Sequence, residues 1–145
     1  MSCEIFLPTT DAEIQACFPA FHALRPHLQA ESFVAQIRRQ EAQSYRIVAI
    51  RQDGCVPSAA GFRYGEFLAW GRILYIDDLT TLPEARGRGF AGALLDWIVA
   101  HARQRNCVAV HLDSGHARHD AHRLYLSKGF RISSHHFSLS LRENP

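Results

Sequence analysis

The sequence has few of the features that mark specialised classes of protein. Its 145 residues include four cysteines and no C-x-x-C pair, which argues against a disulfide framework or a cysteine zinc site. No apolar run approaches the ~20 residues that span a bilayer, and "MSCEIFLPTT" lacks the basic and long apolar regions of a secretory signal. The net charge of +2 is too small to predict a nucleic-acid or membrane surface. We therefore expect a cytoplasmic protein with reduced thiols.

The overall composition is that of an ordinary globular protein. Hydrophobic residues make up 47% and charged residues 21% of the chain, which contains no repeat, low-complexity tract or linker-like stretch. A chain of this length is long enough for one hydrophobic core. We therefore predict a single domain over residues 1–145.

The hydrophobic pattern predicts an α/β fold. "TDAE" at residues 10–13 has the form of a capping box that begins a helix, and Pro19 is expected to kink or split that helix. Apolar residues at helical spacing predict a long helix over 88–106. The expected order is β-α-α-β-β-β-α-β-α-β, a mixed sheet with helices on both faces. Its strands are expected at 4–10, 45–50, 56–71, 72–82, 107–113 and 130–141, and its other helices at 31–43 and 118–129.

A glycine-rich stretch, "ARGRGFAG", follows the strand expected at 72–82. Gly87, Gly89 and Gly92 spell G-x-G-x-x-G, and Asp113 follows at about the 20-residue spacing of a ribose-binding acid in a dinucleotide fold. A strand, a glycine loop and a helix start together favour an anion such as a diphosphate, because the helix start has free N–H groups and a positive dipole end.

The context argues against a dinucleotide fold. Four residues, Pro83 to Arg86, separate the strand from Gly87, whereas the first glycine of that motif lies tight against the strand end. Only one further strand–helix–strand unit follows, which leaves no room for the second half of such a domain. A nucleic-acid site would depend on "RGRG" alone and lacks interleaved aromatic residues.

Taken from Arg86, the same residues give R-x-x-G-x-A, which resembles the acetyl-CoA pyrophosphate loop, Q/R-x-x-G-x-G/A, of the GNAT superfamily of N-acetyltransferases. "AHRLYLSKGF" resembles a later helix of that family, A-x-x-(F/L)-Y-x-x-x-G-F. The two motifs cover residues 73–130. Within the superfamily, "RHDAHRLY" is similar to aminoalkylphosphonate acetyltransferases and "LYIDDL" to polyamine acetyltransferases. Arg118 departs from the pattern, because many relatives have asparagine there, which puts the fine cofactor contacts in doubt.

The resemblance implies acetyl transfer from acetyl-CoA, the expected co-substrate, to an amine that attacks the thioester directly. It makes Tyr125 the general acid that protonates the departing thiolate. Backbone N–H groups would hold the pyrophosphate and polarise the acetyl carbonyl. The residues that the resemblance assigns to this cofactor site are Leu79, Thr80, Thr81, Leu82, Arg86, Gly87, Arg88, Gly89, Phe90 and Ala91.

Two consecutive acids, Asp77 and Asp78, are the candidates for binding or deprotonating the amine. Because consecutive strand residues face opposite sides of a sheet, we expect one of them to face the substrate. A carboxylate also raises the pKa of a nearby ammonium, so an aspartate is a better amine binder than sole base. Arg63, Glu66 and Trp70 are further substrate-side candidates, and Arg63 in the site would suit a substrate that also has an anionic group.

Several alternatives remain open at this stage. The acceptor is a small-molecule amine or a peptide amine, and the resemblance leaves a homodimer open. A catalytically idle acyl-CoA-binding module of the same fold is the competing function. A metal site is not expected, because zinc would be redundant with acetyl-CoA chemistry, although four histidines fall close together: His111, His116, His119 and His122.

Overall fold

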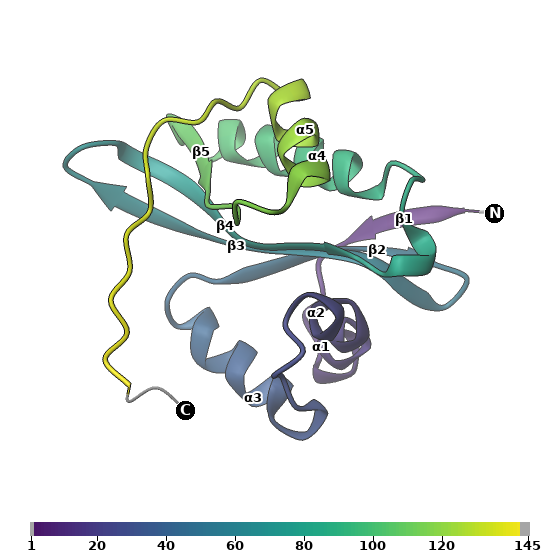
Figure 1. Cartoon of the computed structure of the whole chain (residues 1–145). Helices are drawn as coiled ribbons and strands as arrows, with labels where there is room; N and C mark the ends of the chain where they lie inside the picture. Colours follow the sequence, from purple (N-terminus) through teal and green to yellow (C-terminus); the bar gives the residue numbers. More distant parts are fainter. Residues whose placement is uncertain (1, 143–145) are drawn as a thin grey trace. The chain divides into compact units, whose positions relative to one another are not determined.

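The computed structural model describes residues 2–142, which form two compact units that meet in the sequence between Leu112 and Asp113. The first unit contains every strand and most of the helices (Figure 1). Its elements in chain order are β1 (Cys3–Phe6), α1 (Asp11–Ala16), α2 (Phe18–Leu24), α3 (Ala30–Glu41), β2 (Arg46–Gln52), β3 (Cys55–Phe67), β4 (Gly71–Thr81), the short 3₁₀ helix η1 (Pro83–Ala85), α4 (Phe90–Gln104) and β5 (Ala109–Leu112).

The five strands form one mixed sheet in the order β1-β2-β3-β4-β5. The first three pairings are antiparallel, and only β4 and β5 run parallel. The connection between β4 and β5 contains α4, as a parallel crossover requires. A dinucleotide fold has a mostly parallel sheet, so the topology agrees with the expectation that the glycine loop belongs to another fold.

Helices cover both faces of this sheet, as the sequence predicts. In Figure 1, α4 lies on one face and α1, α2 and α3 lie on the other. The face next to the first three helices has its own buried cluster, in which Phe21, Phe33 and Ile37 pack against strand side chains such as Ile47. On the α4 side, Leu94, Leu95 and Ile98 are almost fully buried, because the apolar positions of α4 recur at helical spacing.

Local sequence determines the start of the first helix and the break that follows it. The Thr10 hydroxyl accepts a hydrogen bond from the Glu13 N–H, and a Glu13 carboxylate oxygen accepts one from the Thr10 N–H, each at 3.1 Å. This confirms the predicted capping box. Pro19 lies in the first turn of α2, where its missing N–H costs nothing, so the predicted helix is divided at Cys17.

The second unit contains one helix, α5 (His119–Ser127), followed by an extended segment. The strand expected at 130–141 is not formed among the described residues, and that prediction is wrong for this structure. The segment has the alternating pattern of a strand, but no strand pairs with it. Its apolar side chains Ile132, Phe137, Leu139 and Leu141 are 82–93% exposed. A strand pattern is realised only where a neighbouring strand supplies hydrogen bonds and a surface to pack on.

Candidate functional site

The glycine loop lies between η1 and α4 and has an open backbone. Gly87 and Gly89 have φ values of 80° and 83°, a left-handed conformation that strains other residues. A Cβ added at either glycine would meet no atom within 4 Å. Gly89 is also the N-cap of α4, and no side chain caps that helix. The first N–H groups of a 15-residue helix are therefore available to an anionic ligand.

The side chains of this loop divide into exposed and buried ones. Arg86 and Arg88 are exposed, and each makes one hydrogen bond of more than 3 Å, to the Thr81 carbonyl and the Gln52 side chain respectively. Phe90 is only 8% exposed and packs in the core, so its backbone alone is available to a ligand. Ala91 is partly buried in the first turn of α4. The loop therefore offers a ligand two exposed positive charges and several backbone donors.

The pairing of β4 with β5 ends before β4 does. The parallel register runs from Ile73 opposite Ala109 to Ile76 opposite Leu112, whereas β4 remains paired with β3 as far as Thr81. Among the described residues, no strand pairs with the β5-facing edge of β4 beyond Ile76. The cofactor-binding residues expected at Leu79, Thr80 and Thr81 lie on this free edge.

Thr80, near the end of β4, and Leu82, just beyond it, already make hydrogen bonds. The Thr80 hydroxyl is buried and donates to the Ala20 carbonyl at 2.8 Å, and the Thr80 carbonyl accepts from the Ser58 hydroxyl at 2.8 Å. The Leu82 N–H donates to the Pro57 carbonyl at 2.8 Å. Leu82 therefore borders the loop without adding a free donor to it.

One irregularity in β4 determines where its two aspartates point. Gly61 of β3 lies opposite Asp78, but the next residue, Phe62, lies opposite Ile76, which leaves Asp77 as an extra residue on β4. Such a β-bulge interrupts the regular alternation of side chains. Asp77 and Asp78 both line the same cavity, so the expectation that they face opposite sides is wrong.

The cavity has a volume of about 210 Å³ and lies within the first unit. We call it the acceptor pocket, after the acceptor amine that we expect from the sequence at Asp77 and Asp78. Its apolar wall comes from Phe21, Leu28, Phe33 and Ile37, and its polar wall from Arg25, His27, Gln36, Gln40, Tyr45, Arg63, Asp77 and Asp78. The pocket therefore combines side chains from the region of α2, from α3, and from the strands β3 and β4.

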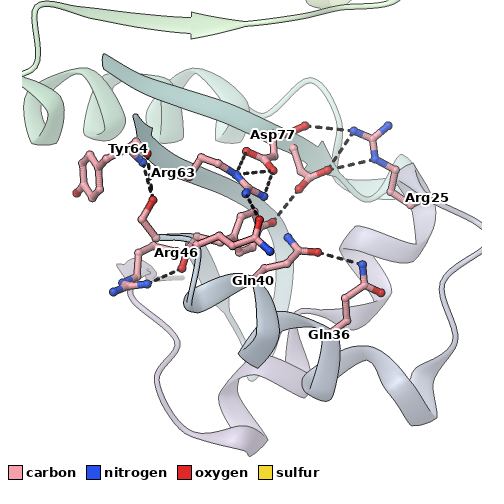
Figure 2. Close-up of polar contacts among 11 residues, drawn as sticks. Arg25, Gln36, Gln40, Arg46, Arg63, Tyr64 and Asp77 are labelled. Atoms are coloured by element: carbon pink, nitrogen blue, oxygen red, sulfur yellow. Dashed lines mark hydrogen bonds and ion pairs between the residues drawn. The ribbon is translucent and has the colours of Figure 1, made fainter. Parts of the chain in front are cut away.

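Asp77 and Asp78 have different partners in the pocket. Arg63 binds Asp77 through two nitrogens, the shortest contact being 2.6 Å from Nη2 to Oδ2. Arg25 donates from Nε and Nη2 to Asp78 Oδ1 at 3.1 and 3.0 Å, and Nη2 also donates to the Asp77 carbonyl. Figure 2 shows Arg63 and Arg25 on opposite sides of Asp77.

A buried tyrosine completes this cluster. The Tyr45 hydroxyl donates to Asp78 Oδ2 at 2.7 Å, and Tyr45 is 1% exposed. Burial and the Asp78 charge raise the pKa of Tyr45 well above its usual value, so it remains a hydrogen-bond donor. Burial also raises the pKa of Asp77, while the hydrogen bond and charge of Arg63 oppose that rise.

Gly61 makes room for the tyrosine. A Cβ at this position would lie 1.6 Å from the Tyr45 hydroxyl oxygen. The ring of Tyr45 thus passes directly against the β3 backbone to reach Asp78. Arg25, Tyr45 and Gly61 were not predicted as functional residues. The only local sign of them was the glycine within a strand pattern, which indicates a bulge or a close backbone approach.

Two of the predicted substrate-side residues lie elsewhere. Arg63 lines the acceptor pocket, but Glu66 is exposed and lies opposite Arg72 near the end of the β3–β4 hairpin. The Trp70 ring packs against the His111 ring, with 4.3 Å between the centroids and a tilt of 34° between the ring planes. Neither Glu66 nor Trp70 is among the residues that line the acceptor pocket.

Tyr125 lies on α5 in the second unit, one turn after Ala121. Its carbonyl accepts hydrogen bonds from the N–H groups of Lys128 and Phe130, and its ring centroid lies 5.9 Å from that of Phe130. Burial raises the pKa of Tyr125 and the Arg118 charge lowers it, with burial dominant. Arg118 is the N-cap of α5 and makes no side-chain capping bond, as its departure from the family pattern suggests.

The histidine-rich segment does not form a metal cage among the described residues, where no group of three or more His, Cys, Asp or Glu is placed to hold an ion. The His119 and His122 rings pack edge to face at 6.0 Å. His122 Nε2 instead contacts the Gly115 carbonyl at 2.9 Å.

In the part of the chain that the structure covers, no helix is long and apolar enough to cross a bilayer.

Comparison with known proteins places these features in one family. The model of the acetyltransferase (GNAT) family matches residues 9–130, and so runs through both units. An uncharacterized N-acetyltransferase, YhdJ of Bacillus subtilis, is 30% identical over 131 residues, which cover 89% of this chain and 92% of that protein. The aminoalkylphosphonate N-acetyltransferase of Salmonella typhimurium is 36% identical over 66 residues, 46% of this chain and 43% of that protein.

Solved structures agree on the fold. The structure of AAC(6')-Iy in complex with the bisubstrate analogue CoA-S-monomethyl-acetylneamine superposes with a TM-score of 0.83, covering 98% of this chain and 99% of that chain at 14% identity. The glycine loop, the sheet order and the family match lead to one conclusion: the chain belongs to the acetyltransferase (GNAT) family and is an N-acetyltransferase.

Proposed function

We propose that this protein transfers the acetyl group of acetyl-CoA to a primary amine, which attacks the thioester directly in a ternary complex. One observation carries the proposal. The single strand β4 leads into an uncapped glycine loop at one end and presents two carboxylates to a cavity at its bulge. A diphosphate site beyond the end of a strand and an amine site on that strand are what this reaction requires.

The glycine loop fits the pyrophosphate of acetyl-CoA. The left-handed Gly87 and Gly89 leave space beside the backbone, and the first N–H groups of α4 have no side-chain cap. In this proposal the backbone from Arg86 to Ala91 donates to the phosphate oxygens. The exposed Arg86 and Arg88 add positive charge next to them.

The free edge of β4 is proposed to bind the rest of the cofactor. Leu79, Thr80 and Thr81 lie beyond the last β4–β5 pair, so backbone groups on that edge are available to the pantetheine amides. A backbone N–H directed at the acetyl carbonyl would stabilise the negative charge that develops on its oxygen during attack.

Asp77 and Asp78 are proposed to bind the acceptor amine. An alkylammonium with a pKa of ~10.4 costs ~4–5 kcal/mol to deprotonate at pH 7, and a nearby carboxylate increases this cost. The aspartates therefore orient the amine, and its proton leaves to solvent, directly or through Asp77, before attack. The neutral nitrogen then forms the C–N bond as the C–S bond breaks, which gives the amide and CoA thiolate.

Tyr125 is proposed to donate the proton that converts the thiolate into the thiol. The newly acetylated nitrogen releases its excess proton to solvent. The Tyr125 phenolate takes up one proton from solvent, so the phenol is regenerated and the protons balance. Burial keeps the Tyr125 pKa high, which holds the phenol in its protonated form at neutral pH. The support for this role is the match of Tyr125 to the family motif.

The acceptor is proposed to be a small amine. The pocket of about 210 Å³ is too small for most of a drug-sized molecule, for which pockets of roughly 300–1,000 Å³ are usual. The relative from Salmonella typhimurium is named for aminoalkylphosphonates, which are small amines of this kind. An open, polar cavity at the carboxylates also argues against an idle module with a blocked substrate site.

The test combines acetyl-CoA binding by calorimetry with release of CoA thiol in the presence of primary amines. We expect acetyl-CoA to bind and NAD not to bind.

Tyr125→Phe should lower kcat by roughly 10²–10⁴-fold and leave acetyl-CoA affinity unchanged, because general acid catalysis contributes about that much. Tyr64→Phe is the matched control, since Tyr64 contacts His101 outside the acceptor pocket and should retain activity. Thiol release that does not depend on Tyr125 would contradict the proposed role of this residue. A calorimetric titration that shows no binding of acetyl-CoA would contradict the proposed function.

A further inference from the structure

The charged groups of the acceptor pocket indicate which amines it accepts. Two arginines, Arg25 and Arg63, and two aspartates, Asp77 and Asp78, line a cavity of about 210 Å³. Their formal charges cancel. A ligand that adds net positive charge would therefore have to compete with the arginines for carboxylates that already have partners.

Both carboxylates are extensively bonded before any ligand arrives. Asp77 receives hydrogen bonds from Nε and Nη2 of Arg63. Asp78 receives bonds from Arg25 and from the hydroxyl of the buried Tyr45. An ammonium group can join this network through remaining oxygen lone pairs, but two ammonium groups would double the unbalanced positive charge in a partly buried site.

Arg25 and Arg63 differ in the number of hydrogen-bond donors that they have left for a ligand. Every nitrogen of Arg63 that carries an N–H group donates within the protein, with Nη1 bonded to Gln43 Oε1 at 3.2 Å. Arg25 uses Nε and Nη2, whereas its Nη1 makes no hydrogen bond to any residue that the structure describes. Its side chain is 41% exposed and lines the pocket, and Figure 2 shows it at the opposite side of Asp77 from Arg63.

We infer that the acceptor is a small zwitterionic amine, whose anionic group binds Arg25 while its ammonium group lies at Asp77 and Asp78. A guanidinium with two free N–H donors is suited to a carboxylate or a phosphonate oxygen. Such a ligand adds no net charge to a neutral pocket and satisfies the unused donor. A polyamine satisfies neither condition, so the local likeness of "LYIDDL" to polyamine enzymes does not extend to the substrate.

This inference rests on the proposed acetyl transfer, and its test separates the two. The full-length protein is assayed for thiol release from acetyl-CoA with amines of similar length: propylamine, 1,3-diaminopropane, β-alanine and 2-aminoethylphosphonate. A peptide with a free N-terminus is added as a fifth acceptor. We expect kcat/KM for the better of the two anionic amines to exceed that for propylamine by at least about tenfold, because hydrogen bonds between charged groups are among the stronger ones in proteins. The diamine should be the poorest small substrate.

Variants identify the residue responsible. Arg25→Gln should reduce the ratio of kcat/KM between the anionic amine and propylamine to near one, and Arg25→Lys should restore part of it. The ratio is informative even if both rates fall, because Arg25 also holds Asp78. Arg46→Gln is the matched control, since Arg46 binds the Glu41 and Tyr45 carbonyls and does not line this pocket, and it should leave the ratio unchanged.

The outcomes are distinguishable. Equal or better turnover of propylamine, the diamine or the peptide would overturn the zwitterion inference and leave the proposed function intact. A preference that survives in Arg25→Gln would overturn the assignment to Arg25. Binding of acetyl-CoA without turnover of any acceptor would overturn both the inference and the proposed catalysis.

Discussion

The glycine loop, which follows β4 and η1, and the acceptor pocket, which β4 helps to line, are built in opposite ways. The loop is one continuous, exposed stretch, and the groups that we propose to bind the cofactor are backbone N–H groups next to Gly87 and Gly89. The pocket is a half-buried cluster of side chains, in which Arg25 and Tyr45 reach Asp78 across 53 and 33 positions of the sequence. A backbone site tolerates many side-chain changes, whereas a side-chain network fails when one member moves.

The largest expected effect comes from closing the space that Tyr45 occupies. Gly61→Ala would put a Cβ 1.6 Å from the Tyr45 hydroxyl oxygen, so Tyr45 must move and its bond to Asp78 must break. We expect a loss of about 3 kcal/mol in the free energy of unfolding, measured by urea denaturation, because overpacking and a lost charged hydrogen bond add.

Gly65→Ala on the same strand is the control for this prediction. Its added Cβ would meet only the ring of the exposed Phe67, which can turn away. We expect a change of less than about 1 kcal/mol. Equal destabilisation by both variants would contradict a specific role for the space that Gly61 leaves for Tyr45.

The next largest effect should appear in the glycine loop, where a substitution is expected to weaken acetyl-CoA binding. Gly89→Ala forces an L-residue into a left-handed conformation at a cost of about 1–2 kcal/mol, with no neighbouring atom to clash. If the residue relaxes to relieve this strain, the first N–H groups of α4 turn away from the ligand. We expect roughly tenfold weaker acetyl-CoA binding by calorimetry.

Gly54→Ala separates this loss of binding from simple backbone strain. Gly54 lies in the turn between β2 and β3, has a φ of 76° and likewise has no atom within 4 Å of an added Cβ. It should lose similar stability and keep its acetyl-CoA affinity. An unchanged acetyl-CoA affinity of the Gly89→Ala variant would show that the loop does not belong to the binding site.

A smaller effect should appear in the pH dependence of kcat/KM, through the pKa of Asp77. Burial raises the pKa of Asp77, and Arg63 opposes the rise. Arg63→Gln removes that opposition, so the pKa rises further and more of the carboxyl is protonated at a given acidic pH. The acid limb of kcat/KM should therefore move to higher pH. An unmoved limb, in a variant that still turns over, would show that the acceptor does not need ionised Asp77.

The smallest effect concerns a local contact outside both regions. Hydrogen bonds from the Thr10 and Thr9 N–H groups lower the pKa of Glu13 from 4.5 to about 2. A lowered carboxyl pKa stabilises the fold above the unfolded value, so this contribution is lost as pH falls from about 4.5 to about 2. Glu13→Gln should remove that dependence while keeping a capping oxygen. Urea denaturation at pH 7 and pH 3 measures it, and identical pH dependence in both proteins would contradict it.

Local signals were sufficient for most of the fold. The capping box at Thr10, the helix break at Pro19 and the helical stripe of Leu94, Leu95 and Ile98 all formed as predicted, because each depends on contacts within a few residues. The strand expected at 130–141 did not form, since its alternating pattern needs a neighbouring strand that the pattern itself does not supply. The single-domain prediction and the role of Tyr125 remain predictions.

The acceptor pocket was only partly predictable. Asp77, Asp78 and Arg63 were chosen for their chemistry and do come together, but Glu66 has the same chemistry and lies apart at the end of the hairpin. The alternation rule placed the two aspartates on opposite faces. A bulge with a single extra residue brings both side chains to the same face, and no residue type next to Asp77 in the sequence indicates this bulge.

The sequence by itself determined the glycine loop and the family, because the residues of the loop are consecutive and their spacing is the motif. Only the tertiary structure decided the acceptor pocket. Long-range packing brings Arg25 and Tyr45 to Asp78, Gly61 opens the space for the tyrosine, and the β4 bulge turns both carboxylates into one cavity. Contacts between residues so far apart in the chain follow from the packing of elements against a sheet, which no short stretch of sequence specifies.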